Sequence, residues 1–211
     1  MYKLLVALAL VAGASAFAPV VKPTTRSSVA VSAAVEDMLG ADVETAGVWD
    51  PFGYSTNADA ATLKRYRCVE IKHGRIAQIA TIGYIMGDVW TFPGYLSKAA
   101  DVKFSDVPAG MGALQAVPVA GWAQIFLFAG LLETKFFKQD DDKEPGDLAK
   151  FNWVRYEDKE LKERKLLSEI KNGRLAMMAI MGMMVQEQVT GMTTIAQLKS
   201  GALSPFPHID L

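Results

Sequence analysis

The amino-acid sequence predicts an all-α membrane protein with three transmembrane helices, the first and third of which are copies that cross about a pseudo-two-fold axis. Three observations lead to this fold class. A charged motif occurs twice, an uncharged stretch of 26 residues lies between the two copies, and 51% of the 211 residues are apolar although 21% are charged. Such a composition indicates that apolar and charged residues are segregated along the chain, as a small membrane protein requires.

The same composition excludes several classes of protein. The apolar fraction is too high for a disordered chain, and the near balance of 22 basic and 23 acidic residues gives no reason to expect a nucleic acid partner. The sequence contains a single cysteine, Cys68, and two histidines. Neither an intramolecular disulfide nor a cysteine-based zinc site is therefore available.

The N-terminus has the composition of a processing segment. Residues 1–16 have the shape of a signal peptide, with one base, an apolar run and a small-residue end. Residues 17–33 contain bases and hydroxyl residues but no acid, as transit peptides do. The sequence ASAFAP at residues 14–19 resembles the cleavage motif of the two-part plastid presequences of diatoms and related algae. We therefore expect residues 34–211 to form the folded domain.

An internal repeat organises this domain. The sequence EIKHGRIA, which begins at Glu70, recurs 99 residues later as EIKNGRLA, which begins at Glu169. In each copy the arginine is followed by twelve uncharged residues. As a helix they rise about 18 Å, which is too little for a hydrocarbon core of about 30 Å. A spanning helix must therefore also immerse the glutamate and the arginine of the motif.

These patterns place three helices at about residues 60–88, 119–133 and 157–190. Charged sequences that favour helix precede both copies, so the first and third helices should begin well before the bilayer. Prolines and glycines between the copies delay the middle helix until about residue 119. Nine basic residues lie between Glu133 and Ser168. The positive-inside rule then places the N-terminus and the second loop on one face, which in a plastid is the stroma.

The charged residues of the repeat need partners outside their own helix. Five residues apart, the glutamate and the arginine of one copy lie about 140° apart around the helix axis and do not face each other. If the two copies cross, Glu70 faces Arg174 and Glu169 faces Arg75 in two interhelical ion pairs. Unpaired charges at membrane depth are costly, so such residues normally pair and mark function. A purely structural role, in which the pairs only lock the helices together, stays open.

Each copy also carries two donors of lone pairs three residues apart, Glu70 with His73 and Glu169 with Asn172. No three or four donors in the sequence have the spacing of a zinc or di-iron site. Isolated donors on a membrane helix suit a metal with one free coordination position, such as the magnesium of a chlorin ring. Gln186, about 21 Å beyond Asn172, is another donor of this kind.

Small residues also recur along both copies and form ladders on the expected helices. Ladders of this kind let a partner helix approach closely on one side and flat pigments on the other, although ordinary helix packing accounts for them almost as well. The residues are Gly74, Ala77, Ala80 and Gly83 in the first copy, and Gly173, Ala176, Ala179 and Gly182 in the second.

The two motifs resemble the ExxHxR and ExxNxR patterns of the light-harvesting chlorophyll-binding superfamily. The resemblance covers residues 46–192 and includes VWDPFG before the first helix, FPGYLS after it and GWAQIFLFAGLLE in the middle helix. Within the superfamily the sequence looks like the fucoxanthin chlorophyll a/c proteins of diatoms and brown algae. The resemblance implies the light-harvesting complex fold, with Arg75 and Arg174 as counter-charges and axial chlorophyll ligands at Glu70, His73, Glu169, Asn172, Gln186, Gln124 and Glu133.

Three candidate residues have alternative roles. Glu133 is either a ligand or a solvated helix end. Gln78 stands where the family pattern has methionine, and it is a secondary candidate for a ligand or for an interhelical hydrogen bond. His208 is a secondary candidate because plant relatives have a C-terminal histidine ligand, but its distance from Asn172 departs from that pattern and favours a surface position.

The resemblance implies a light-harvesting antenna and no enzyme. It implies binding of chlorophyll a, chlorophyll c and fucoxanthin, with diadinoxanthin as a further candidate, and transfer of excitation energy to a photosystem. The implied location is the thylakoid membrane, in an oligomer with lipid, the photosystem core and other antenna subunits as partners. One alternative is a stress-type relative that dissipates excitation as heat, for which Asp88, Asp101 and Asp106 are candidate lumenal acids. The other is a membrane enzyme or transporter with a proton relay, which lacks the expected broken helix.

Overall fold

A computed structural model of the chain describes residues 35, 38–41, 47–56, 58–140, 142–148 and 156–201. The expected presequence, residues 1–16 and 17–33, and His208 lie outside the described residues. Between the longer elements are the 3-10 turns Phe104–Asp106 and Gly110–Gly112. The helices and strands follow in the order α3 (Ala60–Val89), β1 (Tyr95–Ser97), β2 (Val102–Lys103), α4 (Ala113–Ala116), α5 (Val119–Leu131), α6 (Lys159–Thr190) and α7 (Thr194–Ser200).

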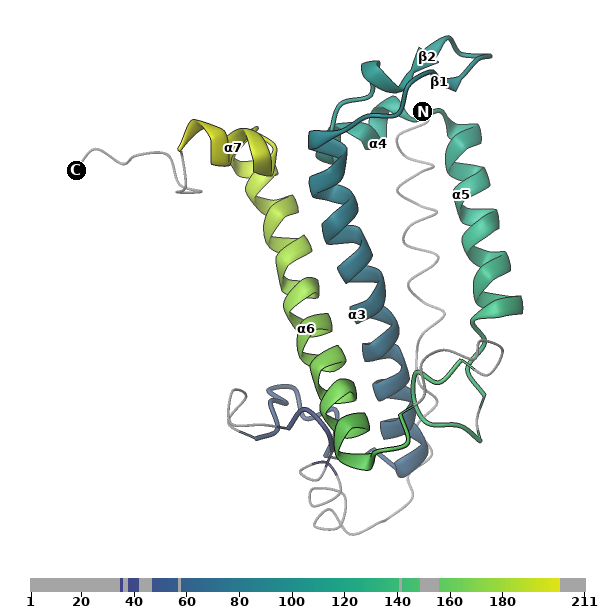
Figure 1. The fold of residues 1–211 in the computed structure, drawn as a ribbon, viewed down its shortest axis with the longest axis vertical. Coiled ribbons are helices and arrows are strands. Elements are labelled where there is room, and N and C mark those ends of the chain that lie inside the picture. Colours follow the sequence, from purple (N-terminus) through teal and green to yellow (C-terminus); the bar gives the residue numbers. More distant parts are fainter. Residues whose placement is uncertain are drawn as a thin grey trace, which may run out of the picture.

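Two long helices, α3 and α6, stand side by side and run in the same direction, and α5 runs in the opposite direction beside them (Figure 1). The antiparallel pair β1–β2 lies at the end where α3 and α6 finish, and α7 lies at the same end (Figure 1). Described residues between α5 and α6, among them 137–140 and 142–148, lie at the other end (Figure 1). The two copies of the repeated motif are therefore on the two central helices.

Glycine backbones meet where α3 and α6 cross. A Cβ atom added to Gly74 would lie 2.9 Å from the Cα of Gly173, and one added to Gly173 would lie 3.0 Å from the Cα of Gly74. The buried residues of the two helices are counterparts in the repeat, 99 residues apart. They are Ile71, Gly74 and Ala77 on α3, and Ile170, Gly173 and Ala176 on α6. The predicted crossing of two related copies is therefore present, with small residues at its centre.

The helix boundaries differ from the expected ones for local reasons. The third helix was expected from residue 157 but begins at Lys159, because the side chain of Asp158 accepts a hydrogen bond from the backbone N of Glu160 at 3.1 Å. The middle helix begins after Pro118 as expected. Its regular part ends at Leu131, and the chain continues as a π-helical turn over Leu132–Phe136. The turn carries Glu133 out of the α-helical register.

No single helix in the described part of the chain is long and apolar enough to cross a membrane by itself. One bent pair, Gly110–Ala116 with Val119–Phe136, meets the length and composition criteria together, with an angle of 109° at its break.

Apolar side chains are exposed along the outer faces of the central helices. The exposed residues again occur as counterparts in the repeat: Ile76, Ile79, Ile82 and Met86 on α3, and Leu175, Met178, Met181 and Val185 on α6. The helix α5 contains no buried residue, although almost all of its residues are apolar. Contiguous exposed apolar surface of this kind marks a face that contacts a protein, a membrane or a ligand.

Two acidic residues anchor neighbouring segments at the end where α3 and α6 finish. Asp88 Oδ2 accepts hydrogen bonds from Thr193 Oγ1 at 2.5 Å and from the backbone N of Ile195 at 3.1 Å. Glu187 is the counterpart of Asp88 in the repeat, and it accepts from the hydroxyl of Tyr84 and from the backbone N of Met111. Asp88 therefore holds α7 against α3, and Glu187 holds the turn before α4 against α6.

Candidate functional site

Two ion pairs join α3 and α6 around the crossing. Arg174 Nε lies 2.6 Å from Glu70 Oε1, and Arg75 Nε lies 2.5 Å from Glu169 Oε1. All four side chains are half-buried or nearly so. The cross-pairing expected from the repeat is present, and each pair joins one helix to the other.

Loop glycines on both sides complete the arginine contacts. Arg174 Nη1 donates to the carbonyl of Gly40 at 2.6 Å, and Arg75 Nη1 donates to the carbonyl of Gly146 at 2.9 Å. Both glycines have a positive φ, 93° and 82°. The sequence did not reveal these two glycines, because their distances from the motif differ. Gly40 lies 30 residues before Glu70, whereas Gly146 lies 23 residues before Glu169, the counterpart of Glu70. The pseudo-two-fold relation thus extends from the helices into the loops that precede them.

The replacement Gly146→Ala should destabilise the protein through this contact. Its Cβ would lie 2.9 Å from Ile71 Cγ2 and would also strain a backbone with positive φ. Gly47→Ala is the matched control, because Gly47 has a φ of 90° and nothing within 4 Å of an added Cβ. We expect a lower thermal midpoint for Gly146→Ala than for Gly47→Ala, measured by circular dichroism. Equal midpoints would contradict the close packing of this loop on α3.

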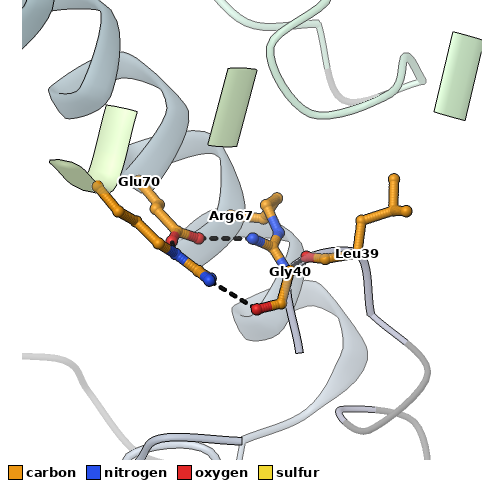
Figure 2. A network of polar contacts seen from close by, with 5 residues as sticks. Leu39, Gly40, Arg67 and Glu70 are labelled. Carbon is orange, nitrogen blue, oxygen red and sulfur yellow. Dashed lines mark hydrogen bonds and ion pairs between the residues drawn. The ribbon is translucent and has the colours of Figure 1, made fainter. Parts of the chain in front are cut away.

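The two glutamates are not equivalent. Glu70 has a second arginine partner, because Arg67 Nη1 lies 2.7 Å from Glu70 Oε2 (Figure 2). Arg67 also donates to the carbonyl of Leu39 at 2.6 Å. The position related to Arg67 in the second copy is Leu166. Both oxygens of Glu70 are therefore held by arginines, whereas Glu169 Oε2 has no hydrogen-bond partner among the described residues.

His73 is exposed on the outer side of α3 with one ring nitrogen free. Its Nδ1 lies 2.8 Å from the backbone carbonyl oxygen of Val69, four residues earlier. Because a carbonyl oxygen only accepts, Nδ1 carries the hydrogen, and Nε2 of the neutral ring keeps its lone pair. The lone pair is the group that an axial magnesium ligand must offer.

Asn172 repeats this arrangement on α6. Its Nδ2 donates to the backbone carbonyl oxygen of Ser168 at 2.8 Å and to the Ser168 hydroxyl at 3.2 Å. The amide oxygen Oδ1 therefore keeps its lone pairs, and the side chain is exposed. Ser168 and Val69 are themselves counterparts in the repeat. On both helices, the N–H group of the side chain thus donates a hydrogen bond to the preceding turn. The atom that keeps its lone pair, His73 Nε2 or Asn172 Oδ1, faces outward.

The other expected site residues are spread along the helices. Gln186 Nε2 donates to Gln197 Oε1, which leaves the amide oxygen of Gln186 as its acceptor. Glu133 pairs with Lys72 of α3, and its side chain is 58% exposed. Gln124 on α5 is exposed, Gln78 is half-buried, and neither has a hydrogen-bond partner in the described part of the chain. Within the described ranges, no three histidine, cysteine or acidic side chains gather to hold a bare metal ion.

The surface around the free donors fits a flat, apolar macrocycle with a central magnesium. His73 and Asn172 each lie beside exposed apolar residues of the same helix face, which continues to Gly83 on α3 and Gly182 on α6. A Cβ added to either glycine would meet nothing within 4 Å. A chlorophyll fits these residues, because its magnesium takes one further lone-pair donor and its ring needs an open apolar face.

A pair of crossing helices, cross-paired charges and isolated lone-pair donors on apolar faces define the class of helical protein to which the chain belongs. The chain belongs to the chlorophyll A-B binding protein family, whose model matches residues 35–188. Among its relatives, it is 40% identical to the chloroplastic fucoxanthin-chlorophyll a-c binding protein B of Phaeodactylum tricornutum, over 89% of this chain and 96% of the relative. It is 37% identical to protein F of the same description from Macrocystis pyrifera, over 86% and 88% of the two chains.

These comparisons confirm the resemblance predicted from the two motifs. The relatives carry the name of pigment-binding proteins rather than enzymes, which agrees with the expectation of a light-harvesting protein and no enzyme. Sequence reasoning missed several residues that support the site. They are Arg67, Lys72, Gly40, Gly146 and Gln197, and each contacts a residue that is distant in the sequence or lies on another element.

Proposed function

We propose that the chain is a light-harvesting antenna protein that binds chlorophyll a, chlorophyll c and fucoxanthin and passes excitation energy to a photosystem. The observation that carries this proposal is the pair of exposed, symmetry-related donors, His73 Nε2 and Asn172 Oδ1. The relatives support the pigment classes, because their names specify fucoxanthin and chlorophylls a and c. Diadinoxanthin stays a further candidate carotenoid.

In this function, isolated side chains would hold the ring magnesium atoms. We assign this role to the neutral side chains of His73, Asn172, Gln186 and Gln124, and to the carboxylates of Glu70, Glu169 and Glu133. Arg75 and Arg174 balance the charges of the two central carboxylates. Glu133 retains one oxygen outside its ion pair with Lys72. Gln78 and His208 stay secondary candidates.

The bound pigments supply light absorption and excitation transfer, and the chain supplies fixed geometry. His73 lies three residues after Glu70, so the two ligand positions are about 4.5 Å apart along α3 and face different directions around it. Because the ligands are on rigid helices that are locked by ion pairs, neighbouring rings keep constant separations. The apolar faces exclude water from the rings and keep the local dielectric constant low.

We further propose that α3, α5 and α6 span the thylakoid membrane. Exposed aromatic residues support this placement, because Tyr66 and Trp90 lie near opposite ends of α3. They are 24 residues apart, about 36 Å along the helix, which matches a hydrocarbon core with its interfaces. The folded domain is residues 34–211, after removal of the presequence. The excess of basic residues before α6 supports a stromal N-terminus.

The stress-type alternative gains no support from the described residues or the comparisons. Asp88 is engaged in holding α7, and Asp106 accepts a hydrogen bond from Ser105 at 3.0 Å. The relatives reported above are named as fucoxanthin-chlorophyll a-c binding proteins. Photosystem and antenna subunits remain the proposed partners of the chain in an oligomer.

The pigment content of the purified protein tests the proposed function. The chain without residues 1–33 is refolded with an equal mixture of chlorophylls a and c and fucoxanthin, and its pigments are then quantified. We expect all three pigments to copurify, and the excitation spectrum of chlorophyll a emission should contain the fucoxanthin band. A spectrum that lacks this band would contradict an antenna role even if pigments were bound.

Removing the donor side chains should remove individual chlorophylls. We expect His73→Leu and Asn172→Leu each to lose one chlorophyll per chain, because leucine offers no lone pair to magnesium. The matched controls exchange the two donors: His73→Asn and Asn172→His should keep the full chlorophyll count. Pigment extraction and high-performance chromatography give the count. An unchanged count in both leucine variants would contradict the ligand assignment.

A further inference from the structure

Gln197 is a polar residue in a strongly buried position. It lies on the short helix α7 beside the end of α6 (Figure 1), and its side chain is 2% exposed. Its Oε1 accepts a hydrogen bond from Nε2 of Gln186. Its own Nε2 has no hydrogen-bond partner in the described part of the chain. An apolar residue would fill this position without the cost of an unpaired amide, so packing does not account for a glutamine here.

The hydrogen bond from Gln186 fixes the orientation of the Gln186 amide. With Nε2 held by Gln197, the Oε1 atom of Gln186 keeps its lone pairs. His73 and Asn172 are oriented in the same manner, since the N–H group of each side chain donates a hydrogen bond to a fixed acceptor. Their acceptors are backbone carbonyl oxygens four residues earlier in the same helix. The acceptor for Gln186 comes instead from a side chain on another element.

A chain of contacts from α3 holds this acceptor in place. Asp88 Oδ2 accepts from the Thr193 hydroxyl and from the backbone N of Ile195, which anchors the first turn of α7. Thr193 also caps α7 by accepting from the backbone N of Ala196 at 3.3 Å. Gln197 follows directly and reaches the amide of Gln186. Through these contacts, the end of α3 determines the orientation of the Gln186 side chain on α6.

We propose that Gln197 is a positioning residue for the chlorophyll that Gln186 binds. Its carbonyl oxygen holds the Gln186 amide with Oε1 available to the ring magnesium, and α7 is the element that brings the two side chains together. The inference rests on the proposed function, because it requires Gln186 to be a chlorophyll ligand.

Pigment counts of four variants of the refolded pigment–protein complex test this inference. Gln186→Leu should lose one chlorophyll per chain. Gln197→Met has a side chain of similar length without the acceptor, and it should lose the same chlorophyll with the same absorption difference spectrum. The double variant should lose no more than either single variant. Gln197→Glu keeps a carbonyl oxygen in either protonation state, and it should retain the full count.

A control on the same helix separates positioning from folding. Leu198 is exposed on α7, and Leu198→Met should keep every chlorophyll. Asp88→Asn keeps Gln197 but weakens the anchor of α7, so we expect partial loss of the same chlorophyll with the same difference spectrum. This variant also tests the inference if Gln197→Met does not refold.

Each contrary outcome has a separate meaning. A full chlorophyll count in Gln197→Met, together with loss of one chlorophyll in Gln186→Leu, overturns the positioning role and leaves the proposed function intact. Loss of several chlorophylls in Gln197→Met, without recovery in Gln197→Glu, also overturns it, because the residue is then structural. No loss in Gln186→Leu shows that the ligand assignment itself is wrong.

Discussion

Replacing Arg75 by leucine should prevent the pigment–protein complex from forming, whereas Arg174→Leu should only weaken it. Loss of Arg75 leaves Glu169 without an arginine among the described residues, in a position that we propose lies within the membrane. Loss of Arg174 leaves Glu70 with Arg67 at 2.7 Å. Removing one partner of a fully buried ion pair costs about 3–5 kcal/mol, and the half-buried pairs here carry a part of that cost.

The yield of refolded complex on a sucrose gradient and its thermal midpoint measure this difference. In the variant with both Arg67→Leu and Arg174→Leu, the yield and the thermal midpoint should fall to those of Arg75→Leu. Glu70 has then lost both of its arginine partners, just as Glu169 has lost its partner in Arg75→Leu. Arg75→Lys is the matched control for charge. Its single ammonium group cannot reproduce the bonds that Nε makes to Glu169 and Nη1 makes to Gly146, so we expect an intermediate yield. Equal yields of Arg75→Leu and Arg174→Leu would contradict the inequivalence of the two glutamates.

The central part of the fold was predictable from sequence because the two copies of the repeat can be aligned with each other, which identifies equivalent positions on the two helices. A charged motif that occurs twice in helices expected to cross a membrane brings unpaired charges twice, and a crossing of the copies pairs Glu70 with Arg174 and Glu169 with Arg75. At the same offset of 99 residues, Ile71 and Ile170 are both buried. These inferences depend on helix periodicity and on the cost of an isolated charge, and both are properties of the local sequence.

The contacts made by loops were not predictable in this way. Gly40 and Gly146 take equivalent positions against Arg174 and Arg75, but their distances from the motif differ by seven residues, so no repeat register relates them. Gln197 is distant from α3 in sequence, and its place depends on the anchor at Asp88. Such contacts arise from the three-dimensional closure of loops, which leaves no periodic signal in the chain.

The small-residue ladders had two expected uses, and the structure shows the first of them, close helix approach, at one step of each ladder. Gly74 and Gly173 lie at the crossing, where the two backbones touch. Gly83 and Gly182, nine residues further along, have open space around them. Two straight helices that cross at an angle touch over only a few turns, so the small residues of a ladder that lie far from the crossing do not contact the other helix. The sequence alone shows the ladder but not the position of the crossing.

The replacement Gly74→Leu should separate the two central helices and prevent folding, and Gly74→Ala should produce a smaller effect of the same kind. Even a methyl group at Gly74 would lie 2.9 Å from the Cα of Gly173, so the backbones must move apart. Overpacking of this kind costs about 1–3 kcal/mol, and it outweighs the gain of about 1 kcal/mol in helix propensity from glycine to alanine. The ion pairs of Arg75 and Glu70, within four residues of Gly74, would lengthen at the same time.

The matched control is Gly83→Ala on the same helix. Gly83→Ala has the same gain in helix propensity as Gly74→Ala but no steric clash, because an added Cβ at Gly83 meets nothing within 4 Å. We therefore expect a thermal midpoint equal to or above that of the unaltered protein, against a clear decrease for Gly74→Ala. If a pigment ring covers this face, Gly83→Leu should lower the pigment count while leaving the helix content of the pigment-free chain unchanged. Equal midpoints for Gly74→Ala and Gly83→Ala would place the crossing elsewhere, because only a site of backbone contact distinguishes these two glycines.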